Sequence, residues 1–441
     1  MIPRKLFTQN VNKVNMVGEP KETPFDYFGW ITMANSLNKY GFTESHLGIG
    51  NGPTISEHLM KPDNSTKKRI FFTNDNQLVT FTSNIDNIAS GAVISTFDLS
   101  RDISNNIVVT KKSEETLYSL LSVPLVNTDH IVQIIQNPDY KNDFLCVFQN
   151  NGIVNIRIDT NGTIHARNLL NYSLYVGDIV NRFYYSDTLR FVTPSIVVLG
   201  GLNSGNSLKF ASFSYTYNSD YTLSTLTNIS TVTKVLGATY TSIITDILQI
   251  VSEDSRLNYF GTLDGSSKAN VGLRLSIDAS GVLSTSSFIE SSTSYTSGRL
   301  NSIDFGVSNI LTINSSSTNN YSASFSDSSI KITKNSSGAR LLTTYFTTYT
   351  LYDRWVQMKD KIFMSFNRGK DTSGSPLPQL TISCGVYNIK LQGKRISLSG
   401  LHTGAESGMI DGCLNQTETK LAMIYNLDTS PRKDYIVVME K

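Results

Sequence analysis

Cysteine and charge are scarce in this chain, and each scarcity excludes a class of protein. Three cysteines, Cys146, Cys384 and Cys413, are spread widely through 441 residues. That spacing matches neither a disulfide framework nor a zinc site, and Cys146, inside an apolar stretch, is expected to be buried. Charged residues make up 17% of the chain and the formal net charge is +2. A balance so near neutrality gives no concentrated basic surface, so we expect no nucleic-acid partner.

Long apolar runs are also missing from the sequence. No window approaches the ~18 apolar residues of a membrane helix, so we expect no membrane insertion. Residues 1–10 have no apolar core of the kind that a signal peptide needs. We therefore expect a protein made in a cytoplasm, which reaches any site outside the cell without a cleaved leader.

The usual catalytic motifs are absent as well. The five histidines show no metal-binding spacing, and no Gly-x-Ser-x-Gly nucleophile turn occurs. Sialidase-type propellers carry Ser-x-Asp-x-Gly-x-x-Trp turns. Here Ser276, Asp278 and Gly281 come close, but the glycine is displaced by one position and no tryptophan follows. We interpret Asp278 as a residue that stabilises its own hairpin loop, and we assign no catalytic residue, metal or cofactor.

What the chain does contain is a short motif that recurs at a fixed interval. Residues 158–164 read IDTNGTI and residues 277–283 read IDASGVL, with a degenerate copy at 217–223 and an earlier one at Phe97-Asp98. The Asp of each copy, or Asn in the degenerate one, is at position 98, 159, 218 or 278, in steps of 61, 59 and 60 residues. Asp followed three residues later by Gly is typical of a hairpin loop closed in the left-handed region. A fixed period of this length indicates a repeat architecture.

Each repeat is predicted to form four strands. The second is the clearest, with strands expected at 130–136, 143–149, 152–159 and 162–168. Four antiparallel strands per repeat, in series, are typical of propeller blades. Six full repeats and one incomplete repeat predict an all-β propeller of seven four-stranded blades. A β-sandwich, or a string of two-sheet domains, is the alternative that strand number alone leaves open.

The incomplete last repeat has two expected strands, at 420–425 and 435–440. An open sheet edge leaves backbone groups unpaired and invites aggregation. We therefore expect N-terminal residues, within 28–52, to close the last blade.

The first 60 residues differ from the rest in being irregular and richer in proline. We interpret 1–60 as an N-terminal arm with the docking and blade-closing segment, and 61–441 as the propeller. An aromatic cluster in the arm consists of Phe25, Tyr27, Phe28 and Trp30. It is interpreted as an apolar plug that anchors the arm on the ring, or as an exposed docking patch for a partner subunit.

Together these traits resemble a family of phage proteins. A chain rich in Ser, Thr, Asn and Tyr, poor in charge and cysteine, all-β and leaderless is similar to the structural or receptor-binding propeller proteins of tailed-bacteriophage tails and virions. Low-complexity stretches at 291–297 and 314–320 contribute to the resemblance. It implies a non-enzymatic virion component in an oligomeric assembly, bound to other virion proteins and, in host attachment, to a host-surface glycan.

Two other functions remain open from the sequence. A carbohydrate-active propeller enzyme, glycosidase- or sialidase-like, would gather acidic residues and Arg around the central channel. A cytoplasmic interaction scaffold of the WD type would carry Gly-His and Trp-Asp pairs at blade spacing, and the sequence has none.

Overall fold

The computed structural model confirms the expected all-β class. Its described residues lie in strands and the turns between them, with one short helix, α3 (Leu117–Leu120). Cys146 is fully buried, as expected. The structure describes residues 54–55, 66–84, 92–105, 107–121, 131–148, 152–171, 175, 186–203, 205–220, 224–251, 255–265, 269–292, 309–310, 320–325, 330–335, 354–357, 362–370, 376–386, 395–397, 408–417, 419–427 and 433–440.

The first two repeats each form an antiparallel four-stranded sheet whose strand order follows the sequence. In the second sheet every strand begins and ends within two residues of its expected bounds. The strands of the first sheet are β2 (Thr66–Asn74), β3 (Gln77–Asn84), β4 (Ala92–Arg101) and β5 (Ile107–Thr116); those of the second are β6 (Ile131–Gln136), β7 (Asp143–Phe148), β8 (Gly152–Ile158) and β9 (Ile164–Leu170).

The third and fourth repeats share one eight-stranded sheet, because strand β14 belongs to both. The repeat predicts two separate strands here, yet β14 runs unbroken for 27 residues. Residues between 225 and 240 pair with β13 and residues between 240 and 251 pair with β15, so Tyr240 is paired on both sides. The strands are β10 (Ser186–Asp187), β11 (Arg190–Thr193), β12 (Ile196–Asn203), β13 (Gly205–Thr216), β14 (Thr225–Val251), β15 (Arg256–Gly265), β16 (Ala269–Ile277) and β17 (Leu283–Ser292).

Two further sheets follow along the chain. Residues 321–334, expected as one strand, form two antiparallel strands, β19 and β20, with residues 326–329 between them. The strands are β18 (Asn309–Ile310), β19 (Asn320–Phe325) and β20 (Ile330–Asn335) in one sheet, and β21 (Arg354–Gln357), β22 (Ile362–Lys370), β23 (Pro376–Val386) and β24 (Arg395–Ser397) in the next.

The last sheet joins the two ends of the chain. Its order is β1 (Thr54–Ile55), β27 (Lys433–Glu440), β26 (Lys420–Leu427) and β25 (Gly408–Leu414). Thr54 pairs with Tyr435, so an N-terminal strand does complete the C-terminal sheet. The closing strand is 54–55, while the expected segment, 28–52, lies outside the described residues. Strand β25 is an addition that the sequence did not predict.

Alternate residues of one strand are buried on opposite faces of its sheet. In β7, Phe144, Cys146 and Phe148 pack against the first sheet, whereas Leu145 and Val147 pack against the third repeat. Because successive side chains of a strand point to opposite faces, one strand serves two interfaces. All six residues of β7 are therefore buried, although the strand belongs to an antiparallel sheet.

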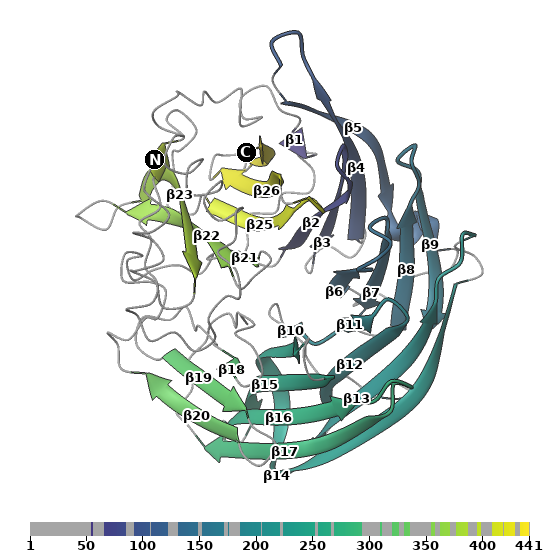
Figure 1. Cartoon of the computed structure of the whole chain (residues 1–441), viewed down its shortest axis with the longest axis vertical. Coiled ribbons are helices and arrows are strands. Elements are labelled where there is room, and N and C mark those ends of the chain that lie inside the picture. Colours follow the sequence, from purple (N-terminus) through teal and green to yellow (C-terminus); the bar gives the residue numbers. More distant parts are fainter. Residues whose placement is uncertain are drawn as a thin grey trace, which may run out of the picture.

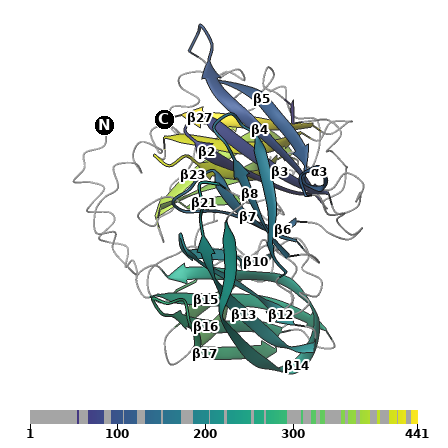
Figure 2. The same ribbon diagram turned by 90° about the vertical axis from the view of Figure 1, so that its right-hand side faces the viewer.

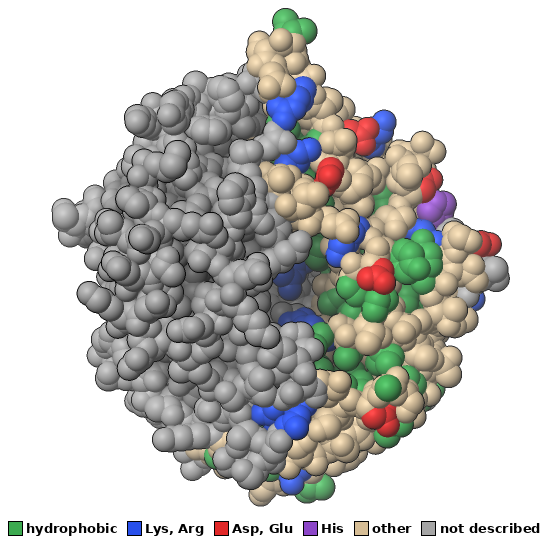
Figure 3. Space-filling view, in the orientation of Figure 1, with side chains coloured by type: hydrophobic (Ala, Val, Ile, Leu, Met, Phe, Trp, Pro, Cys, Tyr) green, Lys and Arg blue, Asp and Glu red, His purple; other side chains and the backbone are tan. Residues whose placement is uncertain are grey.

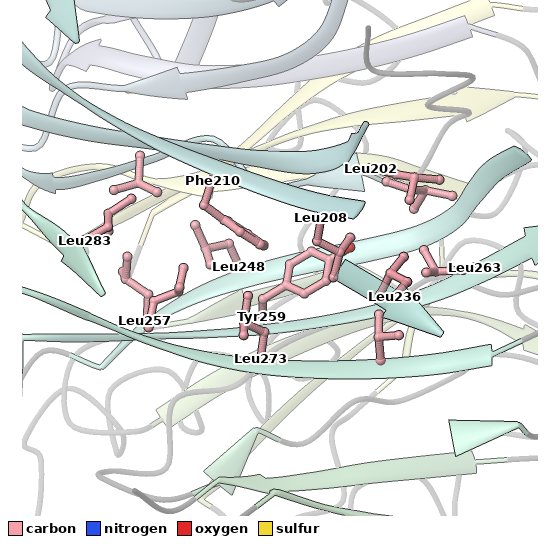
Figure 4. Packing of buried hydrophobic residues seen from close by; sticks show 14 of the residues in the cluster. Leu202, Leu208, Phe210, Leu236, Leu248, Leu257, Tyr259, Leu263, Leu273 and Leu283 are labelled. Carbon is pink, nitrogen blue, oxygen red and sulfur yellow. The ribbon is translucent and has the colours of Figure 1, made fainter. Parts of the chain in front are cut away.

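The largest described core lies between the third and fourth repeats (Figure 4). Phe210 of β13 meets Tyr259 of β15 edge to face, with ring centroids 5.0 Å apart. Edge-to-face contact is a preferred geometry for aromatic pairs and adds to the free energy gained by burying both rings.

The sheets follow one another around the molecule in sequence order, and the last returns beside the first (Figures 1 and 2). Ile70 and Phe72 of β2 share a core with Ile424 of β26 and Ile436 of β27. At the edge of this core, Asp411 accepts the backbone amide of Ile70 at 3.0 Å. The fold is therefore a β-propeller, closed by packing of the last sheet on the first.

The recurring corners hold neighbouring repeats together. The carboxylate of Asp159 accepts the amides of Asn161 and Thr163, and Asp278 accepts those of Ser280 and Val282, which confirms the loop-stabilising role. The corners of the second, third and fourth repeats each accept a hydrogen bond from the third strand of the preceding repeat. The Thr96 hydroxyl donates to the Gly162 carbonyl at 2.9 Å, the Ser212 hydroxyl to the Gly281 carbonyl at 2.6 Å, and the Arg157 guanidinium to the Asn218 and Ser219 carbonyls at 2.5 and 2.8 Å.

The first corner lies later in the sequence than expected. Asp98 sits inside β4, paired with Thr110, and the turn forms at 102–105. There Asp102 accepts the amide of Ser104, and Asn105 takes the left-handed position with a φ of 65°. Asn tolerates this conformation better than other side-chain-bearing residues, so the corner works without glycine.

We predict that Gly162→Ala lowers the free energy of unfolding by about 1–2 kcal/mol or more. The φ of Gly162 is +83°, which L side chains disfavour, and an added Cβ would lie 2.9 Å from the Thr96 hydroxyl oxygen. Asn105→Gly, at the equivalent left-handed position, is expected to change it by less than about 0.5 kcal/mol. Urea denaturation of both variants measures the difference. If the two variants change the free energy of unfolding equally, the left-handed conformation at Gly162 does not contribute to stability as predicted.

Packing at ring closure gives a second prediction. Ile424→Ala removes a fully buried side chain from the core between the last and first sheets. The loss is expected to be about 2–4 kcal/mol of unfolding free energy, because a buried cavity remains. Val235→Ala is the control, since that side chain is 64% exposed. If the two variants unfold at the same urea concentration, the last sheet does not pack on the first.

Candidate functional site

The docking residues predicted from the sequence, Phe25, Tyr27, Phe28 and Trp30, lie outside the described residues, so their role stays a prediction. Within the described part, polar and aromatic side chains gather elsewhere, at the seam between the second and third repeats. This seam cluster comprises Asn137, Tyr140, Asp143, Asn155, Arg157, Tyr215 and Tyr217.

Asp143, the first residue of β7, is the centre of the seam cluster. It is fully buried. Its Oδ1 accepts the side-chain amide of Asn155 at 2.7 Å, and its Oδ2 accepts the Tyr215 hydroxyl at 2.7 Å and the Asn137 side-chain amide at 3.2 Å. A buried carboxylate is tolerated only where hydrogen bonds replace its water. The acid of one repeat is therefore joined to the phenol of the next.

Burial raises the pKa of Asp143, and the bonds from Asn155 and Tyr215 and the charge of Arg157 oppose that shift without cancelling it. Burial, followed by the negative charge of Asp143, also raises the pKa of Tyr215. The phenol of Tyr215 therefore stays protonated and donates a hydrogen bond to Asp143. This Asp-Tyr hydrogen bond joins the sheets of the second and third repeats.

Arg157, near the end of β8, connects the buried part of the cluster to its exposed aromatic residues. Its Cζ lies 4.1 Å from the ring centroid of Tyr217, and the ring of Tyr140 is stacked on Tyr217 at 3.6 Å with an interplanar angle of 3°. Two groups this close to one ring must occupy its opposite faces. The three side chains therefore form a stack with buried Arg157 at the bottom and Tyr140, 41% exposed, at the top.

Asn137 connects the buried acid to the exposed ring. Its Nδ2 donates to Asp143, while its Oδ1 accepts the backbone amides of Asp139 at 3.0 Å and Tyr140 at 3.3 Å. Such a turn fixes the backbone that carries Tyr140. The orientation of the exposed ring is thus set from below by Tyr217 and from its own loop by Asn137.

Sequence patterns gave little sign of this cluster. Position 217 opens a degenerate copy of the corner motif, and Tyr140 belongs to the turn between two predicted strands. No motif relates the two positions. The one available signal was Arg157, a long cation placed in a strand that is otherwise suited to burial.

The described residues show neither a metal site nor a membrane span. No group of three or more His, Cys, Asp or Glu side chains among them is placed to hold a metal ion. No helix in the described part of the chain is long and apolar enough to cross a membrane. On the face in Figure 3, positive and negative side chains of the described residues are interspersed.

The ring of sheets places the chain in the structural class of β-propellers. No protein-family model matches the sequence, and no curated protein sequence matches it. Among solved structures, a Trypanosoma rangeli sialidase in complex with sialic acid is similar at 10% identity and a TM-score of 0.40, over 86% of this chain and 57% of the sialidase. Chaetomium thermophilum Raptor is similar at 7% identity and a TM-score of 0.42, over 86% of this chain and 28% of Raptor.

The raised pKa of Asp143 predicts a pH dependence of stability. Above the ordinary value of 3.8 and below the raised value, the folded chain keeps a proton that the unfolded chain has lost. Stability therefore falls as the pH rises through this window and then levels off. Asp143→Asn removes this titration, so its unfolding free energy, relative to the wild type, should rise with pH.

Urea denaturation from about pH 3 to about pH 8 measures this difference. Thr216→Ala, an exposed and non-titrating neighbour of Tyr215, is the control, and its difference from the wild type should not change with pH. Parallel profiles for the wild type and Asp143→Asn would show that Asp143 does not contribute to the pH dependence.

Proposed function

We propose that the chain is a non-enzymatic component of a tailed-phage virion, a propeller disc that docks on the tail or capsid apparatus and contacts the host-surface receptor. The observation that carries this proposal is that the buried polar groups form hydrogen bonds between neighbouring sheets. Hydrogen bonds of Asp143, Tyr215 and Arg157 cross the seam between the second and third repeats. A hydrogen bond to Asp411 crosses the interface between the last sheet and the first. These groups hold a rigid ring together, which suits a structural part.

The composition supports a virion role more than a free enzyme or scaffold. The chain is weakly charged and rich in neutral polar residues. A surface of this kind interacts weakly with unrelated charged molecules, whereas a strongly charged one would attract them. In this proposal the disc would dock through the N-terminal arm, whose aromatic residues Phe25, Tyr27, Phe28 and Trp30 would form the apolar contact.

A carbohydrate-active enzyme is the main alternative, and the seam cluster bears on it directly. Asp, Tyr and Arg are residue types that sialidase chemistry uses, including a tyrosine nucleophile. Here Asp143 is fully buried, Tyr215 is 2% exposed, and both are engaged with each other. A substrate would have to separate two sheets to reach them, so this cluster supports a structural role.

The proposal predicts that the chain travels with assembled particles. A lysate of cells that express the chain from its native genome is sedimented, and the pelleted particles are washed with salt and examined by quantitative mass spectrometry. The chain is expected in the pellet at a fixed ratio to the other particle proteins. A chain that stays in the supernatant, or that cleaves a fluorogenic sialoside or glycoside at an enzymatic rate, would overturn the proposal.

Variants of the arm separate docking from folding. Replacing Phe28 and Trp30 by Ser should reduce the amount of chain in the particles, because the apolar docking surface is lost. Tyr140→Ala is the matched control, since it removes an aromatic side chain at the seam cluster and should leave the particle content unchanged. Circular dichroism checks that each variant still folds.

A further inference from the structure

The top of the aromatic stack is a preformed flat surface. One face of the Tyr140 ring is covered by Tyr217 at 3.6 Å, and Tyr140 as a whole is 41% exposed, so the opposite face is the one that a ligand could cover. Tyr217 is held in turn by Arg157, whose guanidinium packs on the other face of its ring. Cation–π and aromatic contacts of this kind keep both rings in place. A ligand that stacks on Tyr140 would therefore order few new side-chain torsions.

Polar residues flank the stacked tyrosines in the sequence. Asp139, which precedes Tyr140, is exposed, and Lys141, which follows it, is partly buried. Asn218, beside Tyr217, is also partly exposed. An exposed ring whose neighbours in the chain carry a carboxylate, an ammonium group and an amide is suited to a molecule that has both C–H faces and hydroxyl groups. A pyranose sugar has this combination, since its C–H groups pack on the ring while its hydroxyls bond the neighbouring polar groups.

The charge around the ring argues against a nucleic-acid base as the occupant. Single-stranded nucleic acids also stack on tyrosine, but they require a positively charged groove for their phosphates. Here the turn that carries Tyr140 holds one acidic and one basic residue, Asp139 and Lys141, and the net charge of the whole chain is only +2, so no such positive groove is indicated. A neutral sugar pays no such electrostatic penalty.

We propose that the outer face of Tyr140 is a stacking platform for a pyranose ring of a bacterial surface polysaccharide. Tyr217 and Arg157 are its positioning residues. This inference rests on the proposed role in host attachment and names the surface that would make the contact.

The test uses the purified full-length chain on an array of bacterial O-antigen and capsular polysaccharides, with affinity for the strongest binder then measured by isothermal titration calorimetry. Tyr140→Ala is expected to weaken binding by about tenfold or more, because the stacking surface is lost. Tyr140→Phe should stay within about threefold of the wild type, since it keeps the ring face. Val235→Ala, at an exposed position outside the seam cluster, is the control and should bind like the wild type.

A positioning role for Tyr217 has its own readout. Tyr217→Leu keeps an apolar side chain but removes the stacked ring under Tyr140, so affinity should fall by less than in Tyr140→Ala and the entropic cost of binding should rise. Unchanged melting temperatures would show that all variants fold. A blank array, or equal affinity of the wild type and Tyr140→Ala, would overturn the platform.

The polysaccharide array and the particle sedimentation test the two proposals separately. If the chain sediments with particles but the array is blank, the virion role stands and the platform is wrong. If the array shows binding that depends on Tyr140 while the chain stays out of the particles, the platform stands and the virion role is wrong.

Discussion

Burial of both faces of the sheets in the first three repeats is the constraint on which the described part of the ring depends. The strands of these repeats divide their side chains between two interfaces, as Leu145 and Cys146 do in β7. Because neither face is left for water, the usual alternation of apolar and polar residues disappears from the inner strands. No repeat of this kind can bury its apolar surface alone, so each depends on both neighbours.

Polar groups set the alignment of these apolar interfaces. A hydroxyl or guanidinium on the third strand of a repeat donates to a carbonyl in the corner of the next, at Thr96, Arg157 and Ser212. Apolar contact is non-directional, whereas a buried donor left without its acceptor costs about 1–3 kcal/mol. The corners thus fix how far one sheet slides over another. Arg157 extends this device to the surface by also positioning the aromatic stack.

Sequence patterns predicted the strands best where turn residues mark their ends, as in the second repeat. They failed where those marks are missing. The corner of the first sheet has Asn105 in place of glycine, so its place was missed, and the Thr/Ser-rich stretch around β14 does not show that two repeats share a strand. Strand β25, with glycines at 408 and 412, resembles a loop by composition. The Tyr140–Tyr217 stack joins residues from different repeats, and such a pairing is fixed by sheet packing, which no local pattern encodes.

The closing core also constrains how the chain is made. Ile70 and Phe72 precede their partners Ile424 and Ile436 by about 350 residues along the chain, so the two sides of this core are synthesised at different times. At about 5–20 residues per second, that apolar face waits tens of seconds for its cover. A nascent chain of this topology carries an adhesive apolar surface until β26 and β27 have emerged, and its yield in cells should therefore depend on chaperones that shield the first sheet during that interval.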